Sequence, residues 1–353
     1  MRSRTSYFFV GLTALSISAC GPNDSLSGSA SSSTPSIASP AALQHPTEPP
    51  WAHTAPGIAT FSGRIAFIHF DEATSWTRVY SIDGSDGTIR RLTDDNSYPV
   101  IGDWSPDGRF LALSRNLCPP NPCASIISIL DVRTGAIRDI TSPLPGTLDS
   151  HAKYDREGQR LVFSRSDAGN AYGGNVFTIG IDGSSLMQLP IKATFANNAS
   201  WTRDGAWIRY SESSGSGAAQ EFEIRPDGSG RRVVEAVSSL PARGVEWSPD
   251  DSAITYIADS EPQLVSGNEF VVTPEIWASA PAGSEGRAVV PWPWQGGGAI
   301  WSPDGRSLAF VGGPPGSDGL YIVGLDGGEP MLVPTPDLAP FDLSIAWTTT
   351  TGG

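Results

Sequence analysis

The chain has 353 residues and a formal net charge of −14 at pH 7, with 39 glycines and 30 prolines. An acidic surface repels nucleic acid and anionic lipid, so the charge argues against both as partners. The glycines and prolines favour many tight turns over long helices, and no helical periodicity stands out in the body of the chain.

The N-terminal segment has the pattern of an export signal. Arg2 and Arg4 precede the apolar residues 7–19, a stretch too short to span a bilayer, so residues 1–19 are expected to be a signal peptide. The sequence Ile-Ser-Ala-Cys that ends at Cys20 resembles a bacterial lipobox, which implies cleavage before a lipid-modified Cys20. Glycine after this cysteine resembles the signal for the outer membrane. The alternative is an ordinary signal peptide with an incidental cysteine.

A tether is expected to follow the anchor. Residues 20–56 are rich in serine, proline and alanine and contain no lysine or arginine. Such a segment cannot bury enough apolar surface to fold. We therefore expect it to hold a folded body, residues 57–353, away from a membrane.

The body is organised around the hexapeptide Trp-Ser-Pro-Asp-Gly-Arg. It occurs at residues 104–109 and 301–306, and weaker copies begin at Tyr154, Trp201 and Trp247. Its proline presets a type I turn, and its glycine adopts the left-handed conformation that closes a hairpin. Each copy therefore predicts a tight turn between antiparallel strands. The strands that follow are apolar on both faces, which indicates that both faces are packed.

The spacing of these copies predicts the architecture. Periods near ~45 residues, with four short strands in each, are typical of propeller blades. We therefore predict an all-β fold, a six-bladed β-propeller of four-stranded antiparallel blades. The strand that ends at Trp347 has no partner after it, so this C-terminal strand is expected to close the first blade. The aromatic anchors Trp104, Tyr154, Trp201, Trp247, Trp301 and Trp347 are 50, 47, 46, 54 and 46 residues apart.

The hexapeptide, its apolar strand and a later Asp-Gly turn together resemble the TolB-type, WD40-like propeller repeat, over roughly residues 58–348. TolB itself pairs its propeller with an α/β domain and works in an envelope-spanning complex. This chain has a tether and a candidate lipid anchor in place of that domain, so the resemblance does not transfer partner-binding residues.

Two further cysteines, Cys118 and Cys123, lie in a Cys-Pro-Pro-Asn-Pro-Cys segment between the second and third strands of one blade. In an exported protein, a disulfide that pins this loop is the expected state. The spacing also suits a metal, but no histidine or third cysteine lies nearby in the sequence. We therefore predict a disulfide and no metal site.

The connectivity predicts two different faces. The Ser-Pro-Asp-Gly and Asp-Gly turns fall on one face, which we call the turn face, and longer loops fall on the other, which we call the loop face. Variable loops on a rigid scaffold commonly carry binding residues. Aromatic loop residues are therefore candidates for contact with a partner, although they also suit a role as caps of the blade core. The partner-binding candidates are Trp292, Trp294, Trp76 and Tyr172.

The strands that lead into the anchors carry polar side chains near the central channel. Mixed charges there suit a small ligand or a peptide end, and they equally suit a channel wall whose charges pair with one another. The channel candidates are Asp103, His151, Lys153, Asn198, Arg243 and Glu246.

An enzyme is the less favoured interpretation. The chain has no Gly-x-Ser-x-Gly elbow and no residues left for a hydrolase domain. Some related propellers are polysaccharide lyases that use several histidines and a metal, whereas this body contains only His69 and His151. We expect no catalytic residues and no cofactor.

The sequence therefore favours a non-enzymatic envelope lipoprotein, anchored by lipid in the outer membrane and facing the periplasm or the cell surface. We expect a monomer whose propeller binds a protein or peptide. The alternative is a propeller that binds or cleaves carbohydrate.

Overall fold

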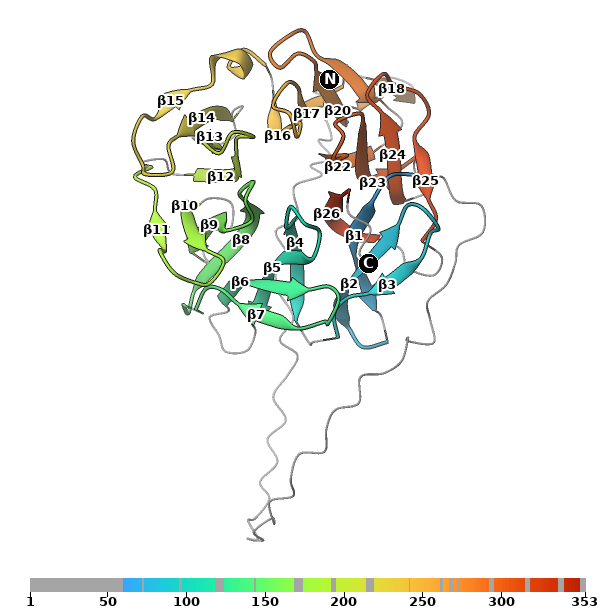
Figure 1. The fold of residues 1–353 in the computed structure, drawn as a ribbon. Helices are drawn as coiled ribbons and strands as arrows, with labels where there is room; N and C mark the ends of the chain where they lie inside the picture. The colour runs from blue at the N-terminus through green and yellow to red at the C-terminus, as the bar shows by residue number, and fades with distance from the viewer. Residues whose placement is uncertain are drawn as a thin grey trace, which may run out of the picture.

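The computed structural model describes residues 60–349 except for 72, 95–96, 118–123, 143, 168–173, 192–194, 214–218, 241, 261–262, 267–268, 272, 292–294, 315–317 and 336–339. In this part of the chain, short antiparallel sheets stand around a central axis (Figure 1). The fold is an all-β propeller, as the sequence predicts. The helical structure described is a single 3-10 turn, η1 (Glu235–Val237), and no described helix is long and apolar enough to cross a membrane.

Four sheets of the ring are separate and have four strands each. In each of them one strand lies nearest the axis and the others follow outwards (Figure 1). From the axis outwards the sheets are β26 (Pro340–Thr348), β1 (Arg64–Asp71), β2 (Trp76–Asp83) and β3 (Ile89–Arg91); β12 (Phe195–Trp201), β13 (Ile208–Ser213), β14 (Gln220–Ile224) and β15 (Arg232–Val233); β16 (Arg243–Trp247), β17 (Ile254–Asp259), β20 (Pro274–Ser279) and β21 (Arg287–Val290); and β22 (Gln295–Trp301), β23 (Ser307–Gly313), β24 (Gly319–Gly324) and β25 (Met331–Val333).

The other ring strands form one eight-stranded sheet, which corrects the prediction of six separate four-stranded blades. Its two halves are antiparallel within themselves, and a single parallel pair, Ser125 with Leu148, joins them. This pair forms where the third strand of one half approaches the first strand of the next. The strands are β4 (Tyr98–Trp104), β5 (Phe110–Leu117), β6 (Ala124–Asp131), β7 (Ile137–Asp139), β8 (Thr147–Tyr154), β9 (Arg160–Asp167), β10 (Asn175–Gly180) and β11 (Met187–Gln188).

The C-terminal strand closes the ring, as predicted. β26 pairs with β1, and Trp347 lies opposite Ile65 in that pairing. The Trp347 indole donates a hydrogen bond to the Ser62 carbonyl at 2.8 Å. Pairing of the last described strand with the first joins the two ends of the described ring in one sheet and covers the inner edge of β1.

The repeated hexapeptide forms the predicted turn. In the first copy, the Gly108 amide donates to the Ser105 carbonyl at 2.8 Å, and Gly108 has φ 64°. The Ser105 hydroxyl donates to Asp107 Oδ1 at 2.6 Å, which fixes the turn from inside. This geometry is open to glycine without a steric cost, so the motif specifies the turn locally.

The apolar strands are packed on both faces, as their sequence predicts. One buried cluster joins Phe67 of β1 to Ala309 and Leu320 of the adjacent sheet. Trp301 is 7% exposed, packs against Ile276 of the adjacent sheet, and donates from Nε1 to the Glu246 carbonyl at 3.0 Å. Trp301 therefore lies between neighbouring sheets.

One element was not predicted. The sequence suggests an irregular loop over residues 260–274, and the structure has a short hairpin there, β18 (Gln263–Ser266) paired with β19 (Glu269–Val271). The two residues between these strands in the sequence are Gly267-Asn268, a pair typical of two-residue hairpin turns, and the sequence analysis did not use this local signal.

Candidate functional site

The channel is shaped by a bulge that recurs in the innermost strands. The register shifts between Ile101 and Trp104 in β4, and between Ser150 and Lys153 in β8. The same shift occurs before Trp247 in β16 and before Trp301 in β22. An extra residue twists the strand locally. The side chain just before the anchor therefore points in another direction than it would in a regular strand, where successive side chains alternate between the two faces.

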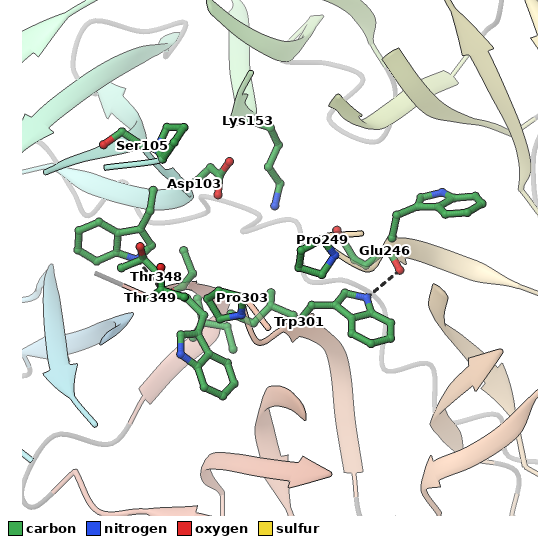
Figure 2. Close-up of a pocket in the computed structure, with 16 residues that line it drawn as sticks. Asp103, Ser105, Lys153, Glu246, Pro249, Trp301, Pro303, Thr348 and Thr349 are labelled. Atoms are coloured by element: carbon green, nitrogen blue, oxygen red, sulfur yellow. Dashed lines mark hydrogen bonds between the residues drawn. The ribbon is translucent and has the colours of Figure 1, made fainter. Parts of the chain in front are cut away.

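These bulges surround a cavity of about 310 Å³ at the turn-face end of the channel. Residues of three repeated turns form its rim, and residues that directly precede the anchors form its wall. Figure 2 shows Lys153 extending into this space, with Asp103 on one side and Glu246 on the other. The lining residues are Asp103, Trp104, Ser105, Pro106, Lys153, Glu246, Trp247, Pro249, Ile300, Trp301, Pro303, Ile345, Ala346, Trp347, Thr348 and Thr349.

Three charged side chains converge on this cavity. Burial disfavours the charged Lys153 ammonium, but the negative charges of Glu246 and Asp103 outweigh that effect and raise the pKa of Lys153. Within the described part of the chain, no hydrogen bond or ion pair joins Lys153 to either carboxylate. The three groups interact through space and leave room between them.

Asp103 is held by the backbone of the next repeat. The Tyr154 amide donates to Asp103 Oδ2 at 3.2 Å. Burial raises the pKa of the Asp103 carboxyl, and the charge of Lys153 opposes that rise. The side chain is half-buried because one side faces the cavity. It can therefore accept further hydrogen bonds from a ligand.

The other channel candidates do not line this cavity. His151 is exposed, has φ 56°, and its Nδ1 lies 3.0 Å from the Ser150 hydroxyl. Asn198 has φ 54° and donates from Nδ2 to the Val245 carbonyl at 2.6 Å, so it links two inner strands. Arg243 is exposed and forms an ion pair with Asp259.

The sequence analysis missed the apolar side of the cavity. Ile300 and Ala346 occupy the same position before their anchors as Asp103, Lys153 and Glu246 do before theirs. The cavity wall is therefore charged on one side and apolar on the other. Alignment of the repeats on their aromatic anchors would have found these positions, because all of them directly precede an anchor.

A second depression, of about 480 Å³, lies beside the first on the turn face. Arg156 and Arg203 line it, and so do Asp250 and Asp304. Hydrogen bonds from the Ser248 and Ser252 hydroxyls lower the pKa of Asp250 to about 2, so this carboxylate stays charged at neutral pH. Both depressions thus lie on the face with short turns, whereas the sequence analysis assigned binding to the loop face.

One loop-face candidate is described in the structure. Trp76 is half-buried, and its ring centroid lies 5.0 Å from that of Tyr98. Its role in binding stays a prediction. The other candidates, Trp292, Trp294 and Tyr172, lie outside the described residues, as do Cys20, Cys118 and Cys123.

A buried carboxyl lies close enough to the channel to sense its charge. Glu221 of β14 is 4% exposed and accepts a hydrogen bond from the Ser211 hydroxyl. Burial raises the pKa of Glu221 to about 7, and the negative charge of Glu246 adds to the rise. The Ser211 bond and the charge of Arg209 oppose it.

The described residues contain no group of three histidine, cysteine, aspartate or glutamate side chains with the geometry of a metal site. The polar groups that do converge are two carboxylates and an ammonium. Such a set can bind a ligand with hydrogen-bond donors and acceptors of its own.

Solved structures with the same fold include two TolB proteins. TolB from Acinetobacter baumannii has a TM-score of 0.63 and 16% identity, over 83% of this chain and 68% of that one. The putative TolB from Agrobacterium tumefaciens has a TM-score of 0.52 and 14% identity, over 78% of this chain and 89% of that one. The chain therefore has a TolB-like β-propeller fold, as its motif predicts.

A similar fold also occurs in an enzyme. Oligogalacturonate lyase from Vibrio parahaemolyticus has a TM-score of 0.50 and 13% identity, over 74% of this chain and 76% of that one. No protein-family model and no curated protein matches the chain. At these identities the likeness shows the fold alone.

Proposed function

We propose that the protein is an exported, non-enzymatic lipoprotein of the cell envelope whose propeller binds a protein or peptide. Lipid on Cys20 would anchor it, and residues 20–56 would tether a monomeric propeller to the membrane. The likeness to two TolB propellers supports the fold on which this proposal depends.

The carrying observation is the cavity at the channel mouth. It combines two carboxylates and an ammonium with an apolar side, and Pro106, Pro249 and Pro303 stiffen its rim. A preformed site of this kind costs little conformational entropy on binding. A peptide offers charged ends, backbone donors and acceptors, and apolar side chains, so it matches both sides of the wall.

Carbohydrate matches this cavity less well. Sugars commonly pack on exposed aromatic faces, but Trp104 and Trp301 are only 4% and 7% exposed. Both indoles also donate hydrogen bonds to backbone carbonyls of adjacent sheets. These two tryptophans therefore serve the packing between sheets, and the other two that line the cavity, Trp247 and Trp347, are half-buried, so none presents a fully exposed face.

We further propose that the propeller functions as six blades, with each half of the eight-stranded sheet acting as one. Each half contains four antiparallel strands, and a single parallel pair links the halves. A crystal structure that divides the ring differently would overturn this count.

The binding proposal is tested by two parallel selections. The full-length protein, purified in mild detergent, is panned against a displayed peptide library and probed on a glycan array. We expect peptides with a shared pattern to be enriched, and we expect Glu246→Gln to reduce their capture. Binding to glycans alone would refute the proposal and favour the carbohydrate alternative.

A further inference from the structure

The arrangement of charges in the cavity points to a more specific ligand. Asp103, Lys153 and Glu246 come from three different inner strands and surround one space. Figure 2 shows the Lys153 ammonium directed into that space, between the two acidic residues. No direct ion pair closes it among the described residues, as noted above.

The balance of charges in the cavity indicates the charge of the ligand group that it binds. With all three groups ionised, two carboxylates face one ammonium, so the cavity carries an excess negative charge. Charges removed from bulk water interact strongly, and an unbalanced one is costly. A ligand with a single positive charge would remove this imbalance, whereas an anion would add to it.

The apolar side decides what accompanies the positive group. Ile300, Ala346 and half-buried Trp347 supply apolar surface to the cavity, and Thr348 and Thr349 also line it. A volume of about 310 Å³ admits a group of roughly one or two amino-acid residues. The ligand group is therefore small, and it is positive at one point and apolar beside it.

We propose that this cavity binds the free amino terminus of a peptide chain, an inference that rests on the proposed peptide-binding function. Asp103 and Glu246 accept hydrogen bonds from the α-ammonium group. Lys153 donates to the carbonyl oxygen of the first residue. An apolar first side chain contacts Ile300 and Trp347, and the following residues leave across the turn face.

The second depression supports an exit in that direction. It adjoins the cavity, since Pro249 and Pro303 line both. Arg156 and Arg203 on its wall are exposed and can pair with carboxylates, while Asp250 and Asp304 can pair with basic side chains. Its volume of about 480 Å³ leaves room for residues that follow an anchored amino terminus.

The test uses tetrapeptides of the form X-Ala-Ala-Ala-amide, with X varied over the natural residues, titrated into the full-length protein by calorimetry. The same peptides carrying an N-terminal acetyl group form the matched set. We expect the free peptides to bind best when X is apolar. Acetylation should weaken binding at least tenfold, equivalent to 1.4 kcal/mol, because it removes the positive charge and two donor hydrogens.

Three variants locate the binding. Asp103→Asn and Glu246→Gln should each weaken the free peptides at least tenfold and leave the acetylated set unchanged. Asp227→Asn is the control, because it makes the same charge change at an exposed turn, where the Asp227 carboxylate accepts a hydrogen bond from the Ser229 amide. This variant should bind the free peptides as the parent protein does. Should Asp103→Asn fail to fold, Glu246→Gln alone tests the carboxylates of the cavity.

The outcomes separate the two proposals. Equal binding of acetylated and free peptides would overturn the amino-terminal site and leave peptide binding intact. Unchanged affinity in both channel variants would do the same. Failure of every peptide, free or acetylated, together with failure of the panning experiment, would overturn peptide binding itself.

Discussion

Replacement of Asp251 by glycine should destabilise the protein, although it restores the turn residue of the other repeats. Asp251 has φ 63°, and the matching residues Gly108 and Gly305 have φ 64° and 70°. Its amide donates to the Ser248 carbonyl at 2.9 Å, so the turn itself is the usual one. Local backbone preference alone would therefore favour glycine here.

The Asp251 carboxylate compensates by joining two sheets. Its Oδ1 accepts from Arg209 Nη1 at 2.6 Å, and its Oδ2 accepts from the Arg203 amide at 2.8 Å. Arg209 also pairs with Glu223 at 3.0 Å and lies 3.8 Å from the centroid of the Trp247 ring. Asp251 thus holds Arg209 in place against Trp247, which is the anchor of the repeat that contains Asp251.

The size of the two opposing effects on the free energy of unfolding decides whether Asp251→Gly stabilises or destabilises the protein. Relief of the left-handed conformation gains at most about 1–2 kcal/mol, and the greater freedom of glycine in the unfolded chain offsets roughly 0.5–1 kcal/mol of this. Each hydrogen bond to a charged group contributes about 1.5–3 kcal/mol. The Asp251 and Arg209 side chains are 24% and 11% exposed, so screening by solvent is limited. The two bonds of the Asp251 carboxylate together outweigh the backbone gain, so we expect a net loss of at least about 1.5 kcal/mol.

Urea unfolding of the full-length protein measures this loss. Gly305→Asp is the matched control, because the nearest atom to a side chain there is Pro249 Cδ at 3.9 Å. There is room for the carboxylate, and the strain should cost about 1 kcal/mol. A double-mutant cycle with Arg209→Gln should give a coupling of at least about 1 kcal/mol. An Asp251→Gly protein as stable as the parent would refute the reasoning.

Three further predictions concern pH and cysteines. The raised pKa of Glu221 means that the folded state holds its proton from pH 4.5 to about 7, so stability should fall as pH rises through that window. Glu221→Gln should flatten this slope in unfolding curves at pH 4 and pH 8, and an unchanged slope would contradict it. Cys20→Ser should release the protein from the membrane fraction, and retention with unaltered mobility would exclude lipidation. Cys118 and Cys123 should resist thiol labelling in exported protein until reduction, whereas labelling at both positions beforehand would exclude the disulfide.

The sequence predicted those features of the fold that depend on local chemistry. Pro106 and Gly108 specify their turn through backbone angles, so the turn follows from the residues themselves. The spacing of the anchors then predicts the ring, and the unpaired strand before Trp347 predicts its closure. The parallel pair between Ser125 and Leu148 depends on how closely two neighbouring sheets approach, and no local pattern encodes that distance.

The sequence predicted only part of the site, because features that depend on non-local geometry also determine which side chains reach the cavity. Lys153 and Glu246 line the cavity as expected, whereas His151 and Arg243, on the same strands, do not. His151 lies within the bulge of β8, and a bulge separates Arg243 from Glu246 in β16. An inserted residue breaks the alternation on which a sequence argument relies. Ile300 was not predicted as a cavity residue, because the sequence argument took only polar side chains as channel candidates.

The repeats hold like residues in their turns but unlike residues at the positions that line the cavity. In a ring of like repeats, equivalent positions hold like residues wherever they only build the scaffold. The hydroxyl-to-carboxylate bonds Ser105–Asp107 and Ser302–Asp304, both at 2.6 Å, are an example. The position before the anchor departs from this rule: it is acidic at Asp103, basic at Lys153 and apolar at Ile300. All three side chains line the same cavity, although Ile300 also packs against the buried cluster of Phe67 and Ala309. A ligand with unlike groups at its end demands this variety, and we therefore expect specificity to reside at this position of the repeat.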